Sequence, residues 1–298
     1  MLRTRSASEL ATHRHQPVDA ATLQAAAVIV EDVRSRGEVA LRHHAERLGD
    51  IVAGQPLIYH PEQLLAALEG LPVEHRRLLE RTAERIRSFA GAQKACLTDL
   101  RTAVPGGFAG HSVSPVESAG CYAPGGRFPL PSSVLMTAVC ARAAGVERVW
   151  VASPRPAQVT LAAAAVAGAD ALLACGGAQA IAAFAYGAGV VPPCDAVVGP
   201  GNRWVTAAKQ LVAGQVAIDM LAGPSELVVF ADGSADPATV ASDLLAQAEH
   251  DPDALPVLVT TSSTLLEAVN RELESQLASL PTAATAAPAV ANGYAVVV

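Results

Sequence analysis

Strand-like and helix-like segments alternate along most of this chain, and this alternation constrains its fold more than any other feature. From Gly120 onward, short runs rich in Val, Ile, Leu and Ala are separated by longer segments whose apolar residues recur at helical spacing. The expected strands are 146–152, 171–174, 195–198, 216–218, 227–230, 255–260 and 294–298, and the expected helices are 131–144, 160–167, 178–186, 203–212, 236–250 and 264–280. Regular succession of strand and helix predicts parallel sheets with right-handed crossovers. We therefore expect an α/β fold with two incomplete Rossmann-like parallel-sheet domains.

The first 120 residues have a different pattern and are expected to be mainly helical. Residues 22–37 and 61–94 place apolar residues at helical spacing with charges between them. Pro105-Gly106-Gly107 marks a loop, residues 113–116 are a candidate short strand, and a loop is expected at 281–288.

Two turns that contain glycine or proline, near Gly120 and Pro224, are candidate domain boundaries. They predict one discontinuous domain made of residues 1–119 plus 225–298, which contains the N-terminal helices. They also predict an inserted Rossmann-like domain made of residues 120–224.

The composition excludes several classes of protein. A chain of 298 residues that is 51% hydrophobic and 16% charged has enough apolar residues for a sizeable core. The net charge of −7 argues against a nucleic-acid-binding protein, because no basic surface is available to replace phosphate counterions. Residues 160–191 are nearly uncharged, but their glycine-containing breaks favour two short helices around a buried strand over a membrane span.

The cysteines and the N-terminus indicate the compartment. The five cysteines include no CxxC pair, and their odd number favours free thiols in a reducing environment. Cys121 lies beside a candidate site loop but is not expected to be a nucleophile. The sequence that follows Met1 lacks the apolar segment of a signal peptide. A cytoplasmic location is therefore expected.

The motif Gly199-Pro200-Gly201-Asn202 lies where an expected strand ends and an expected helix begins. Ligands of open α/β sheets bind at the carboxyl ends of strands, near helix N-termini whose free N–H groups attract anions. The two glycines would let the backbone approach a phosphate or a ribose. The alternative is an ordinary turn in which Asn202 caps the helix. The GxGxxG dinucleotide fingerprint is absent, because Trp204 stands where its third glycine would be.

Two turns of the same kind precede this motif. The segment 122–127, Tyr-Ala-Pro-Gly-Gly-Arg, offers a glycine pair and an arginine, Arg127, that could face an anion. Ser132 and Ser133 follow it as candidate helix caps, and an ordinary tight turn with a capping serine is the alternative. The second turn is Gly176-Gly177-Ala178-Gln179. A buried amide at Gln179 would need a partner, which either a ligand or a backbone group would provide.

Ser225 belongs to a polar group that surrounds Gly223-Pro224, together with Asp219 and Glu226. A lone serine is usually structural. Because the chain has no Gly-x-Ser-x-Gly elbow, a serine hydrolase is disfavoured.

Gln247 and His250 lie three residues apart on one expected helix, so their side chains project to the same side. Gln247 also shares the stripe of Val240 and Leu244, which should face inward. The pair could therefore contribute two ligands to a metal ion. The alternative is a polar helix end, and two ligands fall short of the four of a closed zinc site.

Together these motifs are far more specific than any one of them, and their order and spacing closely resemble the histidinol dehydrogenase family. The matching motifs are residues 122–127, 131–136, 176–180, 199–202, 218–220, 222–226 and 247–250. The resemblance covers essentially the whole chain and is densest from about Gly120 to Thr260.

The resemblance implies an enzyme of histidine biosynthesis that depends on NAD and zinc. Such enzymes oxidise L-histidinol to L-histidine in two hydride transfers through an aldehyde, and they form intertwined homodimers. The residues implied to contact NAD are Tyr122, Gln179 and Asn202. Those implied to contact the substrate are Ser225, Gln247 and His250, the last two also as zinc ligands. Zinc would anchor the imidazole and amine of the substrate and orient its carbinol towards the nicotinamide.

The chain departs from the family pattern at its C-terminus. The family carries a Pro-Glu-His motif after a strand that resembles residues 294–298, and its Glu-His pair performs the acid–base chemistry. That pair and two further zinc ligands have no counterpart before Val298. We therefore expect no catalytic pair within these residues and no turnover of histidinol by this chain alone. The alternatives are a dehydrogenase of another small polar alcohol and a non-catalytic NAD-binding protein.

Overall fold

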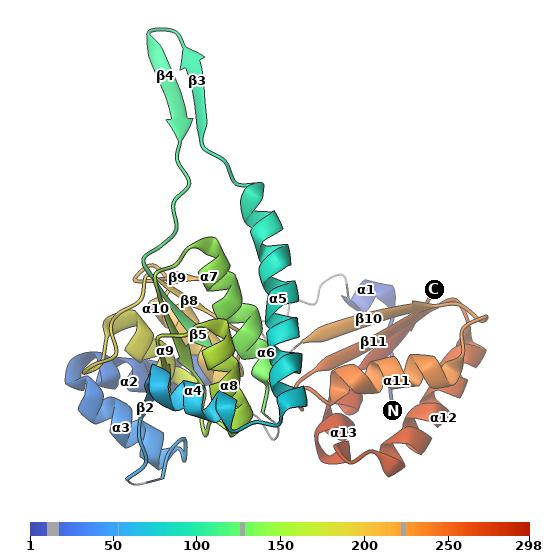
Figure 1. The fold of residues 1–298 in the computed structure, drawn as a ribbon. Coiled ribbons are helices and arrows are strands. Elements are labelled where there is room, and N and C mark those ends of the chain that lie inside the picture. The colour runs from blue at the N-terminus through green and yellow to red at the C-terminus, as the bar shows by residue number, and fades with distance from the viewer. Residues whose placement is uncertain (11–17, 53, 126–128, 222–224) are drawn as a thin grey trace. The chain divides into compact units, whose positions relative to one another are not determined.

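Two mainly parallel β-sheets organise the chain, one in each of two units (Figure 1). The computed structural model describes residues 1–10, 18–52, 54–125, 129–221 and 225–298. The larger unit comprises residues 18–221, and the smaller unit comprises residues 1–17 and 222–298. The predicted α/β fold class with two parallel sheets is confirmed.

The larger unit contains a six-stranded sheet in the order β2-β7-β6-β5-β8-β9. Its parallel strands are β5 Ser118–Tyr122, β6 Arg148–Ala152, β7 Ala171–Leu173, β8 Ala196–Val198 and β9 Ala217–Ile218, and β2 Ile58–Tyr59 pairs antiparallel with β7. The chain runs from β5 through β6 to β7 in one direction, and it then returns across β5 to add β8 and β9. The carboxyl ends of β5 and β8 therefore flank a topological switch point, where open α/β sheets bind ligands.

Helices cover both faces of this sheet. Four helices cover one face: α2 Ala20–Arg36, α3 Glu38–Arg47, α9 Gly177–Tyr186 and α10 Arg203–Val212. The other face is covered by α4 Pro61–Glu69, α5 Val73–Ala95, α6 Pro131–Val134, the π-helical turn η1 Leu135–Val139, α7 Cys140–Ala144 and α8 Gln158–Ala167. Small residues permit the close packing: a Cβ added to Gly120 on β5 would overlap the ring of the fully buried Phe184 on α9. Gly145 ends α7 in the left-handed conformation, as its position in the sequence predicts.

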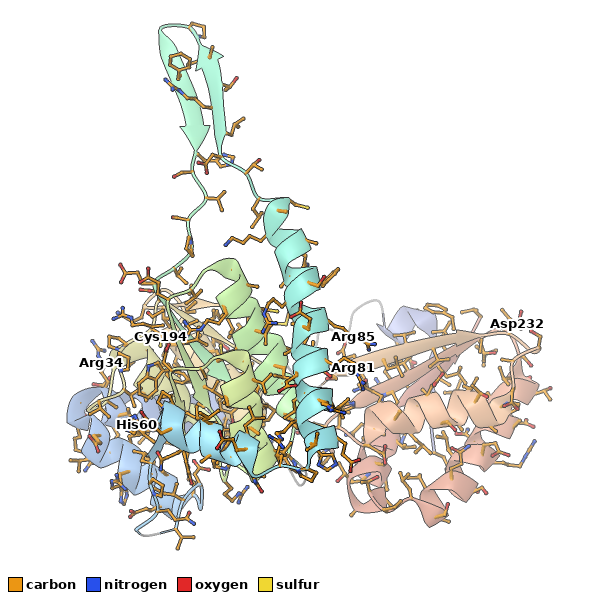
Figure 2. The ribbon with its side chains drawn as sticks, viewed as in Figure 1. Arg34, His60, Arg81, Arg85, Cys194 and Asp232 are labelled. Atoms are coloured by element: carbon orange, nitrogen blue, oxygen red, sulfur yellow. The ribbon has the colours of Figure 1, made fainter. Side chains whose placement is uncertain are left out.

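A β-hairpin formed by β3 Leu100–Val104 and β4 Gly107–His111 projects from the larger unit (Figure 1, Figure 2). All ten of its strand residues are exposed. The predicted loop at 105–107 is the turn of this hairpin, whereas its strands were not predicted. The strand expected at 113–116 was also misplaced, because the strand that enters the sheet, β5, begins at Ser118.

The smaller unit contains a parallel sheet in the order β1-β12-β11-β10. Its strands are β1 Arg3–Thr4, β10 Glu226–Ala231, β11 Leu255–Thr260 and β12 Tyr294–Val297, and its helices are α1 Ala7–Leu10, α11 Pro237–Ala248, α12 Ser263–Ser279 and α13 Ala283–Asn292. The helices α11, α12 and α13 pack with the sheet around one apolar core. Asp236 caps α11 as predicted, because its side chain accepts a hydrogen bond from Thr239 N.

One predicted segment is confirmed with a break, and another is wrong. Residues 61–94 are helical as expected, in two helices, α4 and α5, because Gly70 ends the first and Pro72 precedes the second. The loop expected at 281–288 is wrong, because residues 283–292 form α13. Its alanines favour a helix, and Ala286, Ala289 and Val290 are buried in the core of the smaller unit.

The division into units also differs from the predicted domains. Residues 18–119 pack with the larger unit rather than with 225–298. The physical reason is that α2 contacts α9 and α10, while β2 extends the six-stranded sheet.

Candidate functional site

The carboxyl edge of the larger sheet brings three predicted turns into contact. Gly199 follows β8 with a φ of +120°, and a Cβ at this position would overlap the carbonyl oxygen of Tyr122, the last residue of β5. A Cβ at Gly176, which precedes α9, would lie 2.8 Å from Pro154, which follows β6. The turns after β5, β6, β7 and β8 therefore form one continuous rim at the switch point.

Tyr122 joins two of these turns through its phenol. The side chain is 3% exposed, and its hydroxyl oxygen accepts a hydrogen bond of 3.3 Å from the backbone N–H of Gly177. Burial raises the pKa of Tyr122, and the nearby Asp50 carboxylate raises it further. The phenol is therefore neutral and can act as an uncharged donor and acceptor.

Gln179 is buried, and its protein partner is a carboxylate. The side chain is 1% exposed, and Nε2 donates a hydrogen bond of 2.9 Å to Oδ2 of Asp50. Oε1 is buried without a hydrogen-bond partner among the described residues. An unsatisfied buried acceptor destabilises a protein by about 1–3 kcal/mol, so a ligand donor that reached this oxygen would form a favourable hydrogen bond.

Asn202 has the capping role that was the alternative to a ligand contact. Its Oδ1 accepts hydrogen bonds of 3.1 Å from Trp204 N and 3.2 Å from Val205 N, at the start of α10. Because Oδ1 serves the cap, the exposed Nδ2 is the part of this side chain that could contact a ligand.

A buried ion pair supports the turn that contains Gly199. Lys209 on α10 is 2% exposed, pairs with the Asp219 carboxylate, and donates a hydrogen bond of 2.6 Å to the Gly199 carbonyl oxygen. The other oxygen of Asp219 accepts a hydrogen bond of 2.8 Å from Gly199 N. Sequence reasoning missed Lys209, although a lysine among Val205, Ala208 and Val212 on an apolar helix face was a visible signal.

The start of α6 differs from the predicted helix cap. Leu130 stands at the N-cap of α6, and no side chain of a described residue caps this helix. Ser132 and Ser133 lie inside its first turn, so the prediction that they cap it is wrong. Arg127 lies outside the described residues, as do Gly223 and Pro224 of the later motif.

The other three predicted site residues lie in the smaller unit. Nε2 of Gln247 donates a hydrogen bond of 3.3 Å to the carbonyl oxygen of Ser225, so these two residues are in contact. Gln247 and His250 line one open groove of about 480 Å³ with Leu227, Val228, Val229, Asp243 and Ala246. Gln247 is half-buried rather than fully inward, because it lies at the last turn of α11 beside this groove.

The metal-ligating atoms of Gln247 and His250 in the groove fit part of a metal site. The hydrogen bond from Nε2 leaves Oε1 of Gln247 free to bind a cation, and the exposed imidazole of His250 is a common zinc ligand. The described residues contain no cluster of three or more His, Cys, Asp or Glu side chains that could hold a metal. A four-coordinate zinc ion would therefore need further ligands besides these two.

A second cavity, of about 560 Å³, lies at the opposite edge of the larger sheet. It is lined by residues at the amino ends of the strands, including Ser118, Arg148, Cys194 and Asp195 (Cys194 is labelled in Figure 2). Burial raises the pKa of Cys194 to about 12, so its thiol is not ionised near neutral pH. None of the predicted site residues lines this cavity.

Cys121 is also excluded as a nucleophile by its surroundings. Its side chain is fully buried within β5, and burial raises its pKa to about 12. Within the part of the chain that the structure describes, no helix is both long and apolar enough to cross a membrane.

The sheet order and the rim of turns place the chain among doubly wound α/β proteins. The family model for histidinol dehydrogenase matches residues 12–298. Histidinol dehydrogenase from Thermus thermophilus is 48% identical over 267 residues, which are 89% of this chain and 63% of that protein. The enzyme from Haloarcula marismortui is 50% identical over 252 residues, 83% of this chain and 58% of that protein. The chain belongs to the histidinol dehydrogenase family.

A solved structure agrees with this assignment. The crystal structure of histidinol dehydrogenase from Elizabethkingia anophelis matches with a TM-score of 0.86 at 29% identity, over 100% of this chain and 71% of that chain. The present chain therefore spans only part of its relatives: 63% and 58% of the length of the two curated proteins above.

Proposed function

We propose that this chain provides the NAD-binding site and part of the zinc and substrate site of a histidinol dehydrogenase. The enzyme would oxidise L-histidinol to L-histidine in two NAD-dependent steps through the aldehyde. The observation that supports this most is the rim of turns at the switch point of the larger sheet, where the Tyr122 hydroxyl accepts from Gly177 N and the nearby Gln179 amide donates to Asp50.

Each rim residue would have a different task towards NAD. The buried phenol of Tyr122 offers an uncharged hydroxyl. Gln179 offers an unpaired carbonyl oxygen, and the Nδ2 of Asn202 offers a donor at the mouth of the β8–α10 turn. These groups can bind and orient a nucleotide, while hydride acceptance is the chemistry of the nicotinamide itself.

Calorimetric titration with NAD tests this site. We expect the chain to bind NAD, and we expect Gln179→Leu to raise the Kd about tenfold, the effect of losing one buried hydrogen bond to the ligand. Gln215→Leu is the matched control, because Gln215 lines the cavity at the opposite sheet edge and should leave the Kd unchanged. Absence of NAD binding by the unaltered chain would refute the proposal.

Gln247 and His250 would hold zinc together with further ligands. When bound, zinc would act as a Lewis acid that anchors the imidazole and amine of histidinol. The protein contributes Oε1 of Gln247, whose orientation the Ser225 carbonyl fixes by accepting from Nε2, and a ring nitrogen of His250.

Zinc content measures this second part of the proposal. After dialysis against limiting zinc, we expect His250→Ala to retain at least tenfold less metal than the unaltered chain, because one of two resident ligands is lost. His75→Ala is the control, since His75 is exposed on α5 of the larger unit. Equal metal retention by the unaltered chain and His250→Ala would contradict a zinc site in this groove.

The homodimer and the cytoplasmic location belong to the same proposal. The projecting hairpin supports a homodimer, because it exposes Leu100, Val104 and Phe108 on an arm that lacks a core of its own. Sedimentation velocity of the purified chain measures its oligomeric state directly.

A further inference from the structure

We propose that Asp50 is a positioning residue of the NAD site: its buried carboxylate turns the Gln179 amide so that the carbonyl oxygen is presented to an uncharged hydrogen-bond donor of the nucleotide. This inference rests on the proposed function of the rim. Asp50 lies in the loop after α3 and is 129 positions before Gln179 in the sequence.

Asp50 is surrounded by donors at the start of α9. The residue is 7% exposed. Its Oδ2 accepts hydrogen bonds of 2.8 Å from Gly176 N and 2.9 Å from Gln179 Nε2, and the Cys175 thiol lies 3.6 Å from the same oxygen. Gly176 N and Gln179 Nε2 both donate to this one carboxylate oxygen, so its negative charge orients the Gln179 amide.

This charge determines which end of the Gln179 amide faces which way. If the amide were flipped, Oε1 would face the Asp50 carboxylate, and two acceptors would repel each other. Nε2 must therefore face Asp50, and Oε1 must face the opposite way. A Cβ added to Gly177 would lie 2.8 Å from Oε1, so the glycine at this position keeps space beside the oxygen.

The same geometry defines the kind of group that Gln179 can bind. An amide oxygen accepts hydrogen bonds, and a phosphate at neutral pH has no donor to offer it. In addition, Gly176 stands at the N-cap of the ten-residue helix α9, where an anion would otherwise bind, and Asp50 already supplies the negative charge there. The partner of Gln179 is therefore a hydroxyl or amide N–H of the nucleotide, such as a ribose hydroxyl, and not its pyrophosphate.

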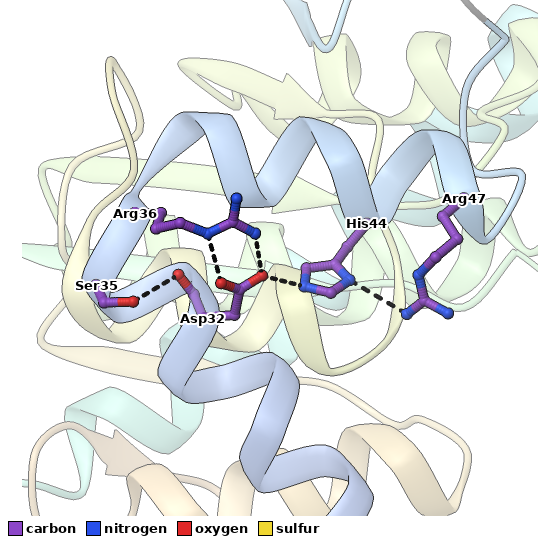
Figure 3. A network of polar contacts seen from close by, with 5 residues as sticks. All are labelled: Asp32, Ser35, Arg36, His44 and Arg47. Atoms are coloured by element: carbon purple, nitrogen blue, oxygen red, sulfur yellow. Dashed lines mark hydrogen bonds and ion pairs between the residues drawn. The ribbon is translucent and has the colours of Figure 1, made fainter.

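A polar network connects α2 with α3, the helix that leads to Asp50 (Figure 3). Asp32 on α2 accepts hydrogen bonds of 2.6 Å from Arg36 Nε and 2.8 Å from His44 Nε2, and Arg47 Nη2 lies 3.2 Å from His44 Nδ1. Because Arg47 can only donate, Nδ1 of His44 accepts and Nε2 carries the proton. Of these bonds, the one between His44 and Asp32 joins α3 to α2, and Asp50 N donates to Ala45 O of α3 over 2.8 Å.

Asp50→Asn tests the inference through NAD affinity. The variant keeps the shape of the side chain but removes the charge that forbids the flipped amide, so we expect the Kd for NAD to rise about tenfold, as for Gln179→Leu. Asp195→Asn is the matched control. Its carboxylate also accepts a backbone and a side-chain hydrogen bond, both from Ser118, but at the opposite edge of the sheet, so NAD affinity should not change.

A double-mutant cycle separates positioning from a merely structural role. If Asp50 acts through Gln179, Asp50→Asn should change the Kd less than twofold in the Gln179→Leu background. Independent tenfold losses that multiply to about a hundredfold would overturn the inference, as would an Asp50→Asn variant that binds NAD normally.

The unaltered chain provides a measurement that does not depend on the folding of a variant. In nitrogen-15 NMR spectra, the side-chain amide of Gln179 should exchange slowly with water, and its resonances should shift when NAD is added. A freely exchanging amide, or one unaffected by bound NAD, overturns the inference while leaving the proposed function intact. If the unaltered chain binds no NAD at all, both the proposed function and this inference fail.

Discussion

The Gly199→Ala variant is expected to lose about 2–6 kcal/mol of unfolding free energy in the larger unit, together with most of its affinity for NAD. Two effects add here. The φ of +120° is unfavourable for an L-residue and costs about 1–3 kcal/mol. The new methyl group would overlap the Tyr122 carbonyl oxygen, which cannot move without shifting β5, and overpacking of this kind costs about another 1–3 kcal/mol.

Urea unfolding monitored by tryptophan fluorescence measures this loss. Trp150 and Trp204 are the only tryptophans of the chain, and both lie in the larger unit, so the signal reports on that unit alone. Gly214→Ala is the matched control, because Gly214 has a φ of +94° with no atom within 4 Å of an added Cβ. Gly214→Ala should lose unfolding free energy only through the unfavourable φ, without a steric overlap. Equal losses of unfolding free energy in the two variants would mean that the close approach of the turn after β8 to β5 does not contribute to the destabilisation.

The alternation of strands and helices was predictable because burial imposes it on the sequence. The expected bounds of α10 and β11 match the structure residue for residue. Asn202 marks the start of α10 with a capping side chain, and the apolar run 255–260 is a strand in the middle of a parallel sheet. Where a segment is buried and has a clear start signal, the local sequence is sufficient to predict its type and its bounds.

The exposed and the alanine-rich segments were not predictable in the same way. The hairpin of β3 and β4 buries neither face, so its residues lack the alternation that identifies a strand. Pro281 and Pro288 made the segment of α13 look like a loop, but tertiary burial of its alanines outweighs that signal. The grouping of residues 18–119 with the larger sheet depends on contacts between distant segments, which no local pattern encodes.

The turns of the candidate site were predictable from the sequence, but the buried residue that contacts them from a distant segment was not. Gly199 and Gly176 mark the rim through their sequence context, and the structure places both at the carboxyl edge of one sheet. Asp50 had no signal at all, since a single aspartate after a helix usually faces solvent, and only folding brings it to Gln179. The roles of Tyr122, Gln179 and Asn202 towards NAD are predictions, which calorimetric titration with NAD tests.

Lys209→Met is expected to destabilise the larger unit by about 3 kcal/mol. Removing one partner of a buried ion pair typically costs about 3–5 kcal/mol, because the other charge is left without compensation. We expect a loss at the lower end of this range, because the side chain of Asp219 is 33% exposed and water can partly solvate it. The variant also loses the hydrogen bond to the Gly199 carbonyl oxygen, so the turn after β8 loosens and NAD affinity falls with the stability.

Lys94→Met is the matched control, because Lys94 is the other lysine of the chain and is exposed on α5. Its unfolding free energy should change by less than about 0.5 kcal/mol, as is usual for surface substitutions. Adding Asp219→Asn to Lys209→Met should recover part of the lost stability, since it removes the uncompensated charge. The contrary result is a double variant that is less stable than Lys209→Met, by as much as Asp219→Asn alone destabilises the unaltered chain. The two side chains would then act independently, and the ion pair would not be what holds the turn in place.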